Sequence, residues 1–246
     1  MSDEDQPVHH LGHTRSVRTS RFLLQTPDTF VRAALPGMRR ATAVVHISPA
    51  GGAGFSQYTA ELEGDGELGP ATVQRFVYVL DGALTIGDDH LVAGDFAYLP
   101  SAFPHSIFAT AVSRAAIIEK PYESLDGRGV PAAYFGRERD IASTHLADDP
   151  WIEVRGLIPD DVAFDFRVNT VVYQPGATLP KVDTHIVEHG LLMLEGGGIC
   201  RLGDALLPVA AGDFVWTSPY CPQWFGALGK TPARYLVYRD WDRHPL

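Results

Sequence analysis

The sequence predicts an all-β protein in which one small antiparallel β-barrel occurs twice in tandem. Three observations support this prediction. Apolar and polar residues alternate in short stretches along the 246-residue chain, Gly (24 residues) and Pro (18 residues) are frequent, and a block of strands and turns recurs once. Many short strands joined by tight turns, together with an internal repeat, are typical of barrel and sandwich architectures.

The predicted strands are stretches in which Val, Ile, Phe and Tyr alternate with polar residues. The clearest of them cover residues 42–47, 76–86, 166–173 and 234–238. Such alternation places the apolar side chains on one face of a strand. Helical periodicity is weak, so we expect at most a turn or two of helix around residues 28–34 and 131–141.

A repeat relates the two halves of the chain, with Gly82 matching Gly196 and Gly94 matching Gly212. Three blocks recur in the same order, at offsets of 114, 118 and 120 residues: 76–86 with 190–200, 92–105 with 210–223, and 113–123 with 233–243. Small loop insertions would produce this growing offset. We therefore expect the same fold twice.

The repeat divides the chain into an arm, two barrels and a connection. We expect an N-terminal arm and first strand at 1–40, a first barrel without a metal site at 41–121, a linker at 122–160, and a second barrel with a metal site at 161–246. The arm contains His9, His10 and His13, which a solvated chain terminus explains better than a metal site.

The composition excludes several classes of protein. A formal net charge of −10 argues against nucleic-acid binding, because phosphate contacts need clustered Lys and Arg. No apolar run approaches the ~18 residues of a membrane-spanning helix, and the acidic N-terminus is no secretory signal. Cys200 and Cys221 provide no disulfide framework. We expect a cytosolic protein without a membrane partner.

A candidate metal site lies in the motif Asp183-x-His185-x-x-x-His189. Residues two apart on a strand share a face, and a bend brings in the third side chain. A carboxylate and two imidazoles suit Mn, Fe, Co, Ni or Zn. Gln223 follows the second Gly-Asp turn, at the position that His105 holds in the first half, and its carboxamide oxygen would complete the site.

The first half provides an internal control for this hypothesis. Histidines four apart on a strand-rich surface are more often solvated than metal-bound, so the motif alone is a weak signal. Subtracting 114 from the motif positions gives Gly69, Ala71 and Arg75, which could not replace the ligands. The difference indicates one working site and one structural half.

Two further candidates lie on the last strand of the second half. Tyr235 and Arg239 share a face, and an arginine is suited to a substrate carboxylate through paired hydrogen bonds. For each residue a structural role is an equally good explanation. Tyr235 would then belong to the barrel core, and Arg239 would form a surface ion pair with Asp240 or Asp242.

The chain resembles the bicupins, and within them the (S)-ureidoglycine aminohydrolase family. The blocks that carry the resemblance are THIVEHGLLMLEG, GDFVWTSPYCPQWFGALGKT and RYLVYRD in the second half, and RFLLQTPDTFVRAALPGM and RFVYVLDG in the first. The likeness therefore spans most of the chain, and the PQWFGALGKT and RYLVYRD segments are its most specific parts.

The resemblance implies a bicupin fold, a Mn²⁺ cofactor, a small ureide substrate and a homo-oligomer. Its metal ligands fall on Asp183, His185, His189 and Gln223, its catalytic residues on Asp183, Tyr235 and Arg239, and its substrate contacts on those three residues and Gln223. The implied reaction converts (S)-ureidoglycine and water into (S)-ureidoglycolate and ammonia, a step of purine (allantoin) degradation.

Three positions depart from the family pattern. Asp183 replaces the usual Glu, Arg239 replaces a Lys, and Cys200 replaces a Tyr. These changes bear on substrate preference more than on fold. We expect Cys200 and Cys221 to be packing residues rather than reactive or ligating thiols.

Other functions fit parts of the same pattern. A bicupin dioxygenase would need redox iron or copper, usually on three histidines. A metal-dependent isomerase or lyase acting on a small carboxylate or sugar would also use Arg239. A non-catalytic cupin would bind a ligand without turnover and without a metal.

Overall fold

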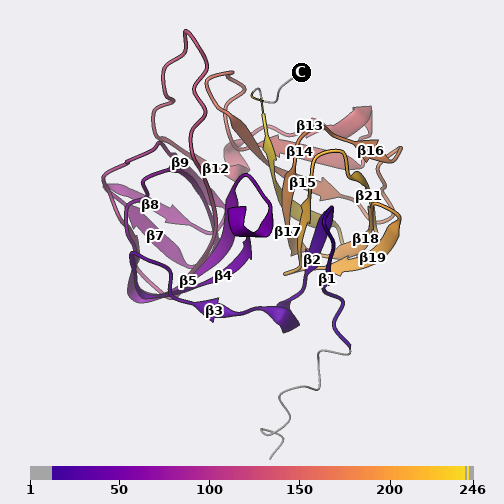
Figure 1. Cartoon of the computed structure of the whole chain (residues 1–246), viewed down its shortest axis with the longest axis horizontal. Coiled ribbons are helices and arrows are strands. Elements are labelled where there is room, and N and C mark those ends of the chain that lie inside the picture. Colours follow the sequence, from indigo (N-terminus) through magenta and orange to yellow (C-terminus); the bar gives the residue numbers. More distant parts are fainter. Residues whose placement is uncertain (1–12, 242, 244–246) are drawn as a thin grey trace, which may run out of the picture.

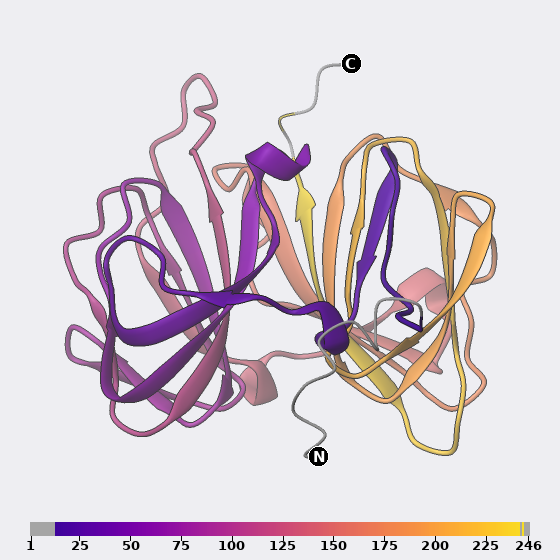
Figure 2. The same ribbon diagram turned by 60° about the horizontal axis from the view of Figure 1, so that its bottom comes forward.

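The chain folds into two β-barrels that lie side by side in the computed structural model, which describes residues 13–241 and 243 (Figures 1 and 2). The predicted all-β class is confirmed. The helices within the described residues are single 3-10 turns: η2 (Pro27–Thr29), η3 (Pro49–Gly51), η4 (Glu138–Asp140) and η5 (Leu146–Asp148). Of these, η2 and η4 lie in the two regions where the sequence predicted helical turns.

The first barrel is a ten-stranded antiparallel sheet that curls on itself. Its strands are β3 (Arg32–Ala33), β4 (Met38–Ile47), β5 (Ser56–Leu68), β6 (Gln74–Asp81), β7 (Ala83–Ile86), β8 (Asp89–Val92), β9 (Asp95–Leu99), β10 (Ile107–Ala109), β11 (Ser113–Lys120) and β12 (Tyr134–Arg137). Buried apolar side chains, among them Leu62, Val77 and Ile117, fill the interior of this barrel.

The second barrel is formed by an eight-stranded and a four-stranded sheet. The larger sheet contains β1 (Val17–Arg18), β2 (Phe22–Gln25), β13 (Thr144–His145), β14 (Ile152–Gly156), β15 (Phe166–Tyr173), β17 (His189–Glu195), β20 (Phe214–Thr217) and β22 (Ala233–Asp240). The smaller sheet contains β16 (Asp183–Thr184), β18 (Gly197–Leu202), β19 (Ala205–Ala210) and β21 (Pro222–Ala227).

Equivalent glycines form equivalent turns in the two barrels. Gly82 (φ 78°) and Gly196 (φ 64°) follow β6 and β17, while Gly94 (φ 86°) and Gly212 (φ 90°) precede β9 and β20. A Cβ on Gly82 or Gly196 would lie 2.4 Å from a backbone oxygen. These turns therefore require glycine for both backbone conformation and space.

Segments outside the repeat complete both barrels. From the N-terminal arm, β2 pairs with β20 of the second barrel, and Figure 2 shows this indigo strand among the orange ones. From the region expected to be a linker, β12 pairs with β9 of the first barrel and β14 pairs with β15 of the second. Strands β9 and β20 would otherwise present free hydrogen-bonding edges, and this explains why non-repeated segments are built into the sheets.

An apolar cluster joins the two barrels. It includes Phe76 and Phe96 from the first barrel and Phe166 and Tyr238 from the second, all fully buried. Side chains of the first barrel pack directly on the backbone of Gly190, where a Cβ would lie 2.3 Å from the side-chain oxygen Oε1 of Gln57. The strand that begins with His189 is thereby fixed against the first barrel.

Candidate metal centre

Strand pairing brings the predicted site residues together at one end of the second barrel. Asp183 on β16 lies opposite Gln223 on β21, and His189 on β17 lies opposite Arg239 on β22. Cross-strand pairs of this kind place side chains in contact on one face of a sheet. The loop that carries His185 is closed by its backbone oxygen, which accepts a hydrogen bond from the backbone N–H of Tyr220 at 2.6 Å.

These side chains line a cavity of about 160 Å³ inside the second barrel. The polar lining contains all six predicted site residues, namely Asp183, His185, His189, Gln223, Tyr235 and Arg239. The remaining wall is mostly apolar and includes Leu146, Val154, Val215 and Trp224. A largely apolar pocket with a few polar groups is the usual form of a small-molecule site.

His189 is buried and uncharged. Burial lowers the pKa of His189 to about 3, so that the imidazole is neutral at pH 7 and one ring nitrogen has a free lone pair. Nδ1 of His189 contacts both ends of the Gln223 carboxamide. It lies 2.7 Å from Nε2 of Gln223 and 3.1 Å from Oε1 of Gln223. Nε2 of His189 is buried without a hydrogen-bond partner among the described residues.

Asp183 and His185 lie nearer the solvent than His189. Their side chains are 28% and 39% exposed, and Nε2 of His185 lies 4.0 Å from Oδ2 of Asp183. Lys181 approaches the other carboxylate oxygen of Asp183 at 3.6 Å. Within the described residues, no group of three His, Cys, Asp or Glu side chains is arranged to hold a metal ion. Ligation by the full set therefore requires the half-exposed side chains to turn inward and needs the carboxamide of Gln223.

The donor set fits a divalent cation. A buried imidazole nitrogen without a partner is costly unless something binds it. The rings of His185 and His189 are 5.0 Å apart between centroids, and burial keeps the pKa of His185 below its usual value as well. Two neutral imidazoles, one carboxylate and one carboxamide oxygen are borderline-to-hard ligands of the kind that manganese, iron and zinc accept.

Arg239 is a half-buried cation without an anionic partner among the described residues. None of the carboxylates in the described residues forms an ion pair with it, Nε has no hydrogen-bond partner, and the guanidinium lies 4.9 Å from the centre of the Trp241 ring. Burial lowers the pKa of Arg239. Asp240, one of the two ion-pair partners considered from the sequence, contacts Lys120 instead, and Asp242 lies outside the described residues.

Tyr235 is both cavity lining and barrel core. Its side chain is buried, and its hydroxyl is hydrogen-bonded to the hydroxyl of Tyr173 at 3.0 Å. Both cysteines are buried and free, and only Cys200 lines the cavity. Burial raises the pKa of Cys200 to about 12, which leaves this thiol protonated and unreactive at pH 7.

The pairing register agrees with the sequence comparison. Gly198 and Cys200 lie opposite Ala227 and Phe225, and their matches in the first barrel, Leu84 and Ile86, lie opposite Ala109 and Ile107. The same offset of 118 residues relates Gln223 to His105.

Several cavity residues were not foreseen from the sequence. Asn169 on β15 and Thr217 on β20 are polar members of the wall, and the Thr217 hydroxyl lies 3.4 Å from Oε1 of Gln223. Leu146 and Val154 come from the segment expected to be a linker. The repeat gave no signal for these two, because they lie outside it.

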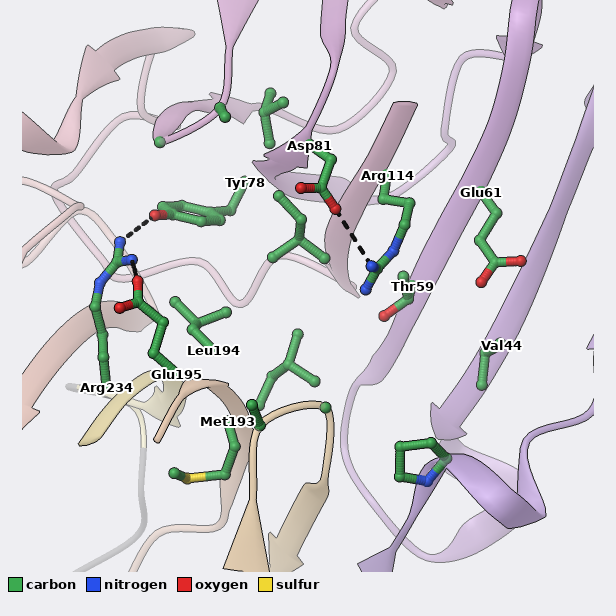
Figure 3. A pocket seen from close by; sticks show the side chains of 18 of the residues that line it. Val44, Thr59, Glu61, Tyr78, Asp81, Arg114, Met193, Leu194, Glu195 and Arg234 are labelled. Carbon is green, nitrogen blue, oxygen red and sulfur yellow. Dashed lines mark hydrogen bonds and ion pairs between the residues drawn. The ribbon is translucent and has the colours of Figure 1, made fainter. Parts of the chain in front are cut away.

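A larger cleft of about 1180 Å³ lies between the barrels (Figure 3). It is nearly symmetric, because Asp81 and Arg114 of the first barrel correspond to Glu195 and Arg234 of the second. These equivalent pairs are 3.2 Å and 2.8 Å apart. Each of these arginines has a carboxylate partner, unlike Arg239, so the smaller cavity is the better candidate site.

Comparison with known proteins identifies the fold and the family of the chain. A cupin-domain family model matches residues 169–238. The (S)-ureidoglycine aminohydrolase of Arabidopsis thaliana is 37% identical over 247 residues, which are 96% of this chain and 80% of that protein.

Two solved structures share the fold. Protein Ylba from Escherichia coli has a TM-score of 0.82 and 24% identity, with 95% of this chain and 97% of that chain covered. A variant of the Bacillus subtilis oxalate decarboxylase has a TM-score of 0.69 and 14% identity, with 94% and 80% covered. The cupin fold is thereby confirmed. No helix in the described part of the chain is long and apolar enough to cross a membrane.

Proposed function

Because the chain belongs to the (S)-ureidoglycine aminohydrolase family, we propose that its second barrel catalyses the metal-dependent hydrolytic deamination of (S)-ureidoglycine. The products are (S)-ureidoglycolate and ammonia, in the degradation of purines by way of allantoin. One observation carries the proposal. Within the described residues, a neutral imidazole with an unpartnered nitrogen and a guanidinium without a carboxylate partner line the same cavity, so that the cavity offers places for a cation and for an anion.

The proposed cofactor is Mn²⁺, held by Asp183, His185, His189 and Gln223. Support comes from the donor types, from the neutral state of the histidines and from the buried lone nitrogen of His189. When bound, a divalent cation supplies Lewis-acid chemistry and a template for the substrate.

Arg239 is the proposed binding site for the substrate carboxylate. The residue is half-buried with its Nε buried, and no carboxylate of the described residues pairs with it, so a substrate carboxylate would supply the missing charge through paired hydrogen bonds. Tyr235 hydrogen-bonds the bound substrate in this proposal. Its hydroxyl already exchanges a hydrogen bond with Tyr173, which fixes its direction.

Asp183 is the proposed proton carrier. In the reaction, a C–O bond to water replaces the C–N bond of the amine at the central carbon. Water loses a proton and the departing amine gains one. A carboxylate at the solvent side of the cavity, 28% exposed, can accept and return that proton. The apolar wall opposite keeps bulk water away from the reacting carbon.

One experiment tests the proposal. Purified protein is analysed for bound metal, and ammonia and the configuration of ureidoglycolate are measured with (S)-ureidoglycine as substrate. The expected result is stoichiometric manganese and formation of the S product. Full activity of a metal-free preparation, or oxygen uptake during turnover, would contradict the mechanism.

A further inference from the structure

Asn169 contacts the guanidinium of Arg239 inside the cavity. With its carboxamide turned so that oxygen faces the guanidinium, Oδ1 accepts a hydrogen bond from Nη2 of Arg239 at 2.9 Å, and Nδ2 donates to the backbone oxygen of Val168 at 3.0 Å. The opposite orientation would set donors against donors and acceptors against acceptors, so the hydrogen-bonding pattern selects the first one.

The position of Asn169 is set by the sheet. It lies on β15 opposite Val237 of β22, so that it is the diagonal neighbour of Arg239 on the inward face. Its side chain is only 8% exposed and lines the cavity. Asn169 is therefore a buried polar residue whose hydrogen bonds are used to hold one cation in place.

The charge of the partner is the important feature. A carboxamide oxygen orients a guanidinium but does not neutralise it, whereas a carboxylate at the same position would form an ion pair. Arg239 also keeps Nε without a partner. Its positive charge and one donor thus stay available to whatever enters the cavity.

The first barrel shows the alternative arrangement at the same strand positions. Tyr58 and Glu119 occupy the places of Asn169 and Arg239, and the Tyr58 hydroxyl donates to Glu119 at 3.1 Å. Glu119 is neutralised by Arg75, whose Nε lies 2.7 Å away. A neutral orienting residue therefore occurs in both barrels, but only the second leaves the oriented charge free.

We propose that Asn169 is a positioning residue that holds Arg239 for a substrate carboxylate and makes the cavity select anionic substrates over their neutral amides. The identity of the substrate in this inference rests on the proposed function. The preference for a carboxylate does not depend on it.

The test uses an unreactive pair of ligands and the metal-loaded protein. N-carbamoylglycine carries the carboxylate and ureido groups of the proposed substrate without its amine, and its amide is the neutral counterpart. Calorimetry should show that the native protein prefers the acid. Asn169→Asp is nearly isosteric, and its carboxylate would form a fixed ion pair with the guanidinium of Arg239. In this variant, affinity for the acid should fall about 10- to 100-fold. Affinity for the amide should change little.

Asn169→Ala should have a smaller effect in the same direction, because it frees the guanidinium without neutralising it. For (S)-ureidoglycine, both variants should raise KM more than they lower kcat, with bound metal unchanged. Unchanged affinity for the acid in Asn169→Asp would overturn the proposal. So would an equal loss of affinity for the acid and the amide.

A second readout needs no variant, because Asn169 is the only asparagine in the chain. Protein labelled with ¹⁵N in asparagine should give one pair of side-chain amide signals. These signals should shift on addition of the acid and stay in place with the amide. Side-chain amide signals whose chemical shifts do not change with either ligand would also overturn the proposal.

Tyr58→Phe is the matched control, since it removes the orienting hydroxyl from the first barrel. It should leave both affinities and the KM unchanged. The two proposals fail separately. If the acid binds through Asn169 but (S)-ureidoglycine releases no ammonia, the function is wrong and this inference stands. If ammonia is released and Asn169→Asp keeps its KM, this inference is wrong and the function stands.

Discussion

At the same end of each barrel, two neighbouring strands place one residue opposite another. In the first barrel the pair is Arg75 and Glu119, and in the second it is His189 and Arg239. The first pair is an ion pair with 2.6 Å between Nη2 and Oε1. In the second pair, neither residue has a charge partner in the described part of the chain, and each keeps a buried nitrogen without a hydrogen bond there.

The positions of Gln223 and His105 show a second contrast. Gln223 lies on β21 opposite Asp183, whereas the matching His105 lies outside the strands of the first barrel and is exposed. One fold therefore supports two uses of the same positions. An ion pair satisfies the charged groups at the first barrel's positions, whereas His189 and Arg239 keep unsatisfied nitrogens that are ready for ligands. This arrangement costs stability that a bound ion and substrate would offset.

The largest expected effect is loss of the imidazoles that distinguish the second barrel. His185→Ala and His189→Ala, tested separately, should each abolish both bound manganese and ammonia release. Each variant leaves a single imidazole among the proposed ligands. Metal analysis and an ammonia assay measure these losses. His105→Ala, on the exposed end of the first barrel, serves as the control and should keep both. Retained metal in the His189 variant would remove the basis of the comparison.

Removal of the free cation should be the next largest effect. Arg239→Ala should raise KM for (S)-ureidoglycine about 100-fold, the loss expected for charge-assisted hydrogen bonds to one carboxylate. Bound metal should stay the same. Arg239→Lys keeps the charge but not the paired donors, so its KM should lie between those of the native protein and Arg239→Ala. A KM that is the same in all three proteins would exclude Arg239 from substrate binding.

In the first barrel, removal of Arg75, the cation of the corresponding pair, should affect stability alone. Arg75→Leu leaves Glu119 without its partner in a largely buried place and should lower the free energy of unfolding by about 2–3 kcal/mol. The double variant with Glu119→Leu should recover most of that loss, because two apolar residues can replace a buried ion pair. Urea unfolding measures both. Neither variant should change KM, and an altered KM would show that the two barrels are coupled.

The smallest effect concerns the junction, where His46 joins both barrels. Its Nδ1 contacts Gln25 at 2.8 Å, its Nε2 contacts Thr59 at 2.9 Å, and its ring stacks on Phe214 with centroids 4.8 Å apart. Burial lowers the pKa of His46 to about 3 from the ordinary 6.5.

Below pH 6.5 the unfolded chain binds the proton and the folded chain does not, so stability falls as pH decreases from 6.5 toward 3. Between pH 6.5 and pH 5, His46 should account for about 1–2 kcal/mol of that loss. His46→Gln should flatten the unfolding free energy measured by urea across this range. An unchanged slope would show that His46 is protonated in the folded protein.

Much of this structure could be predicted from local patterns. Alternating apolar residues and the glycines at 82, 94, 196 and 212 indicate two similar barrels, and the positive φ of these glycines confirms their turn positions. The six predicted site residues line one cavity because each lies on an inward strand position or just before one. Alternation in a strand depends on neighbours two residues away, and a sequence displays this directly.

Other features depend on which strands become neighbours. The crossing of β2 to β20, the entry of Leu146 and Val154 into the cavity wall, and the contact between Asn169 and Arg239 join residues far apart in the chain. No local pattern encodes such pairings. The chain alone determined the barrels, their turns and the chemical types at the open end of the second. The tertiary structure decided which cation stays unpaired and what holds it, because burial and charge compensation exist only after distant strands have packed together.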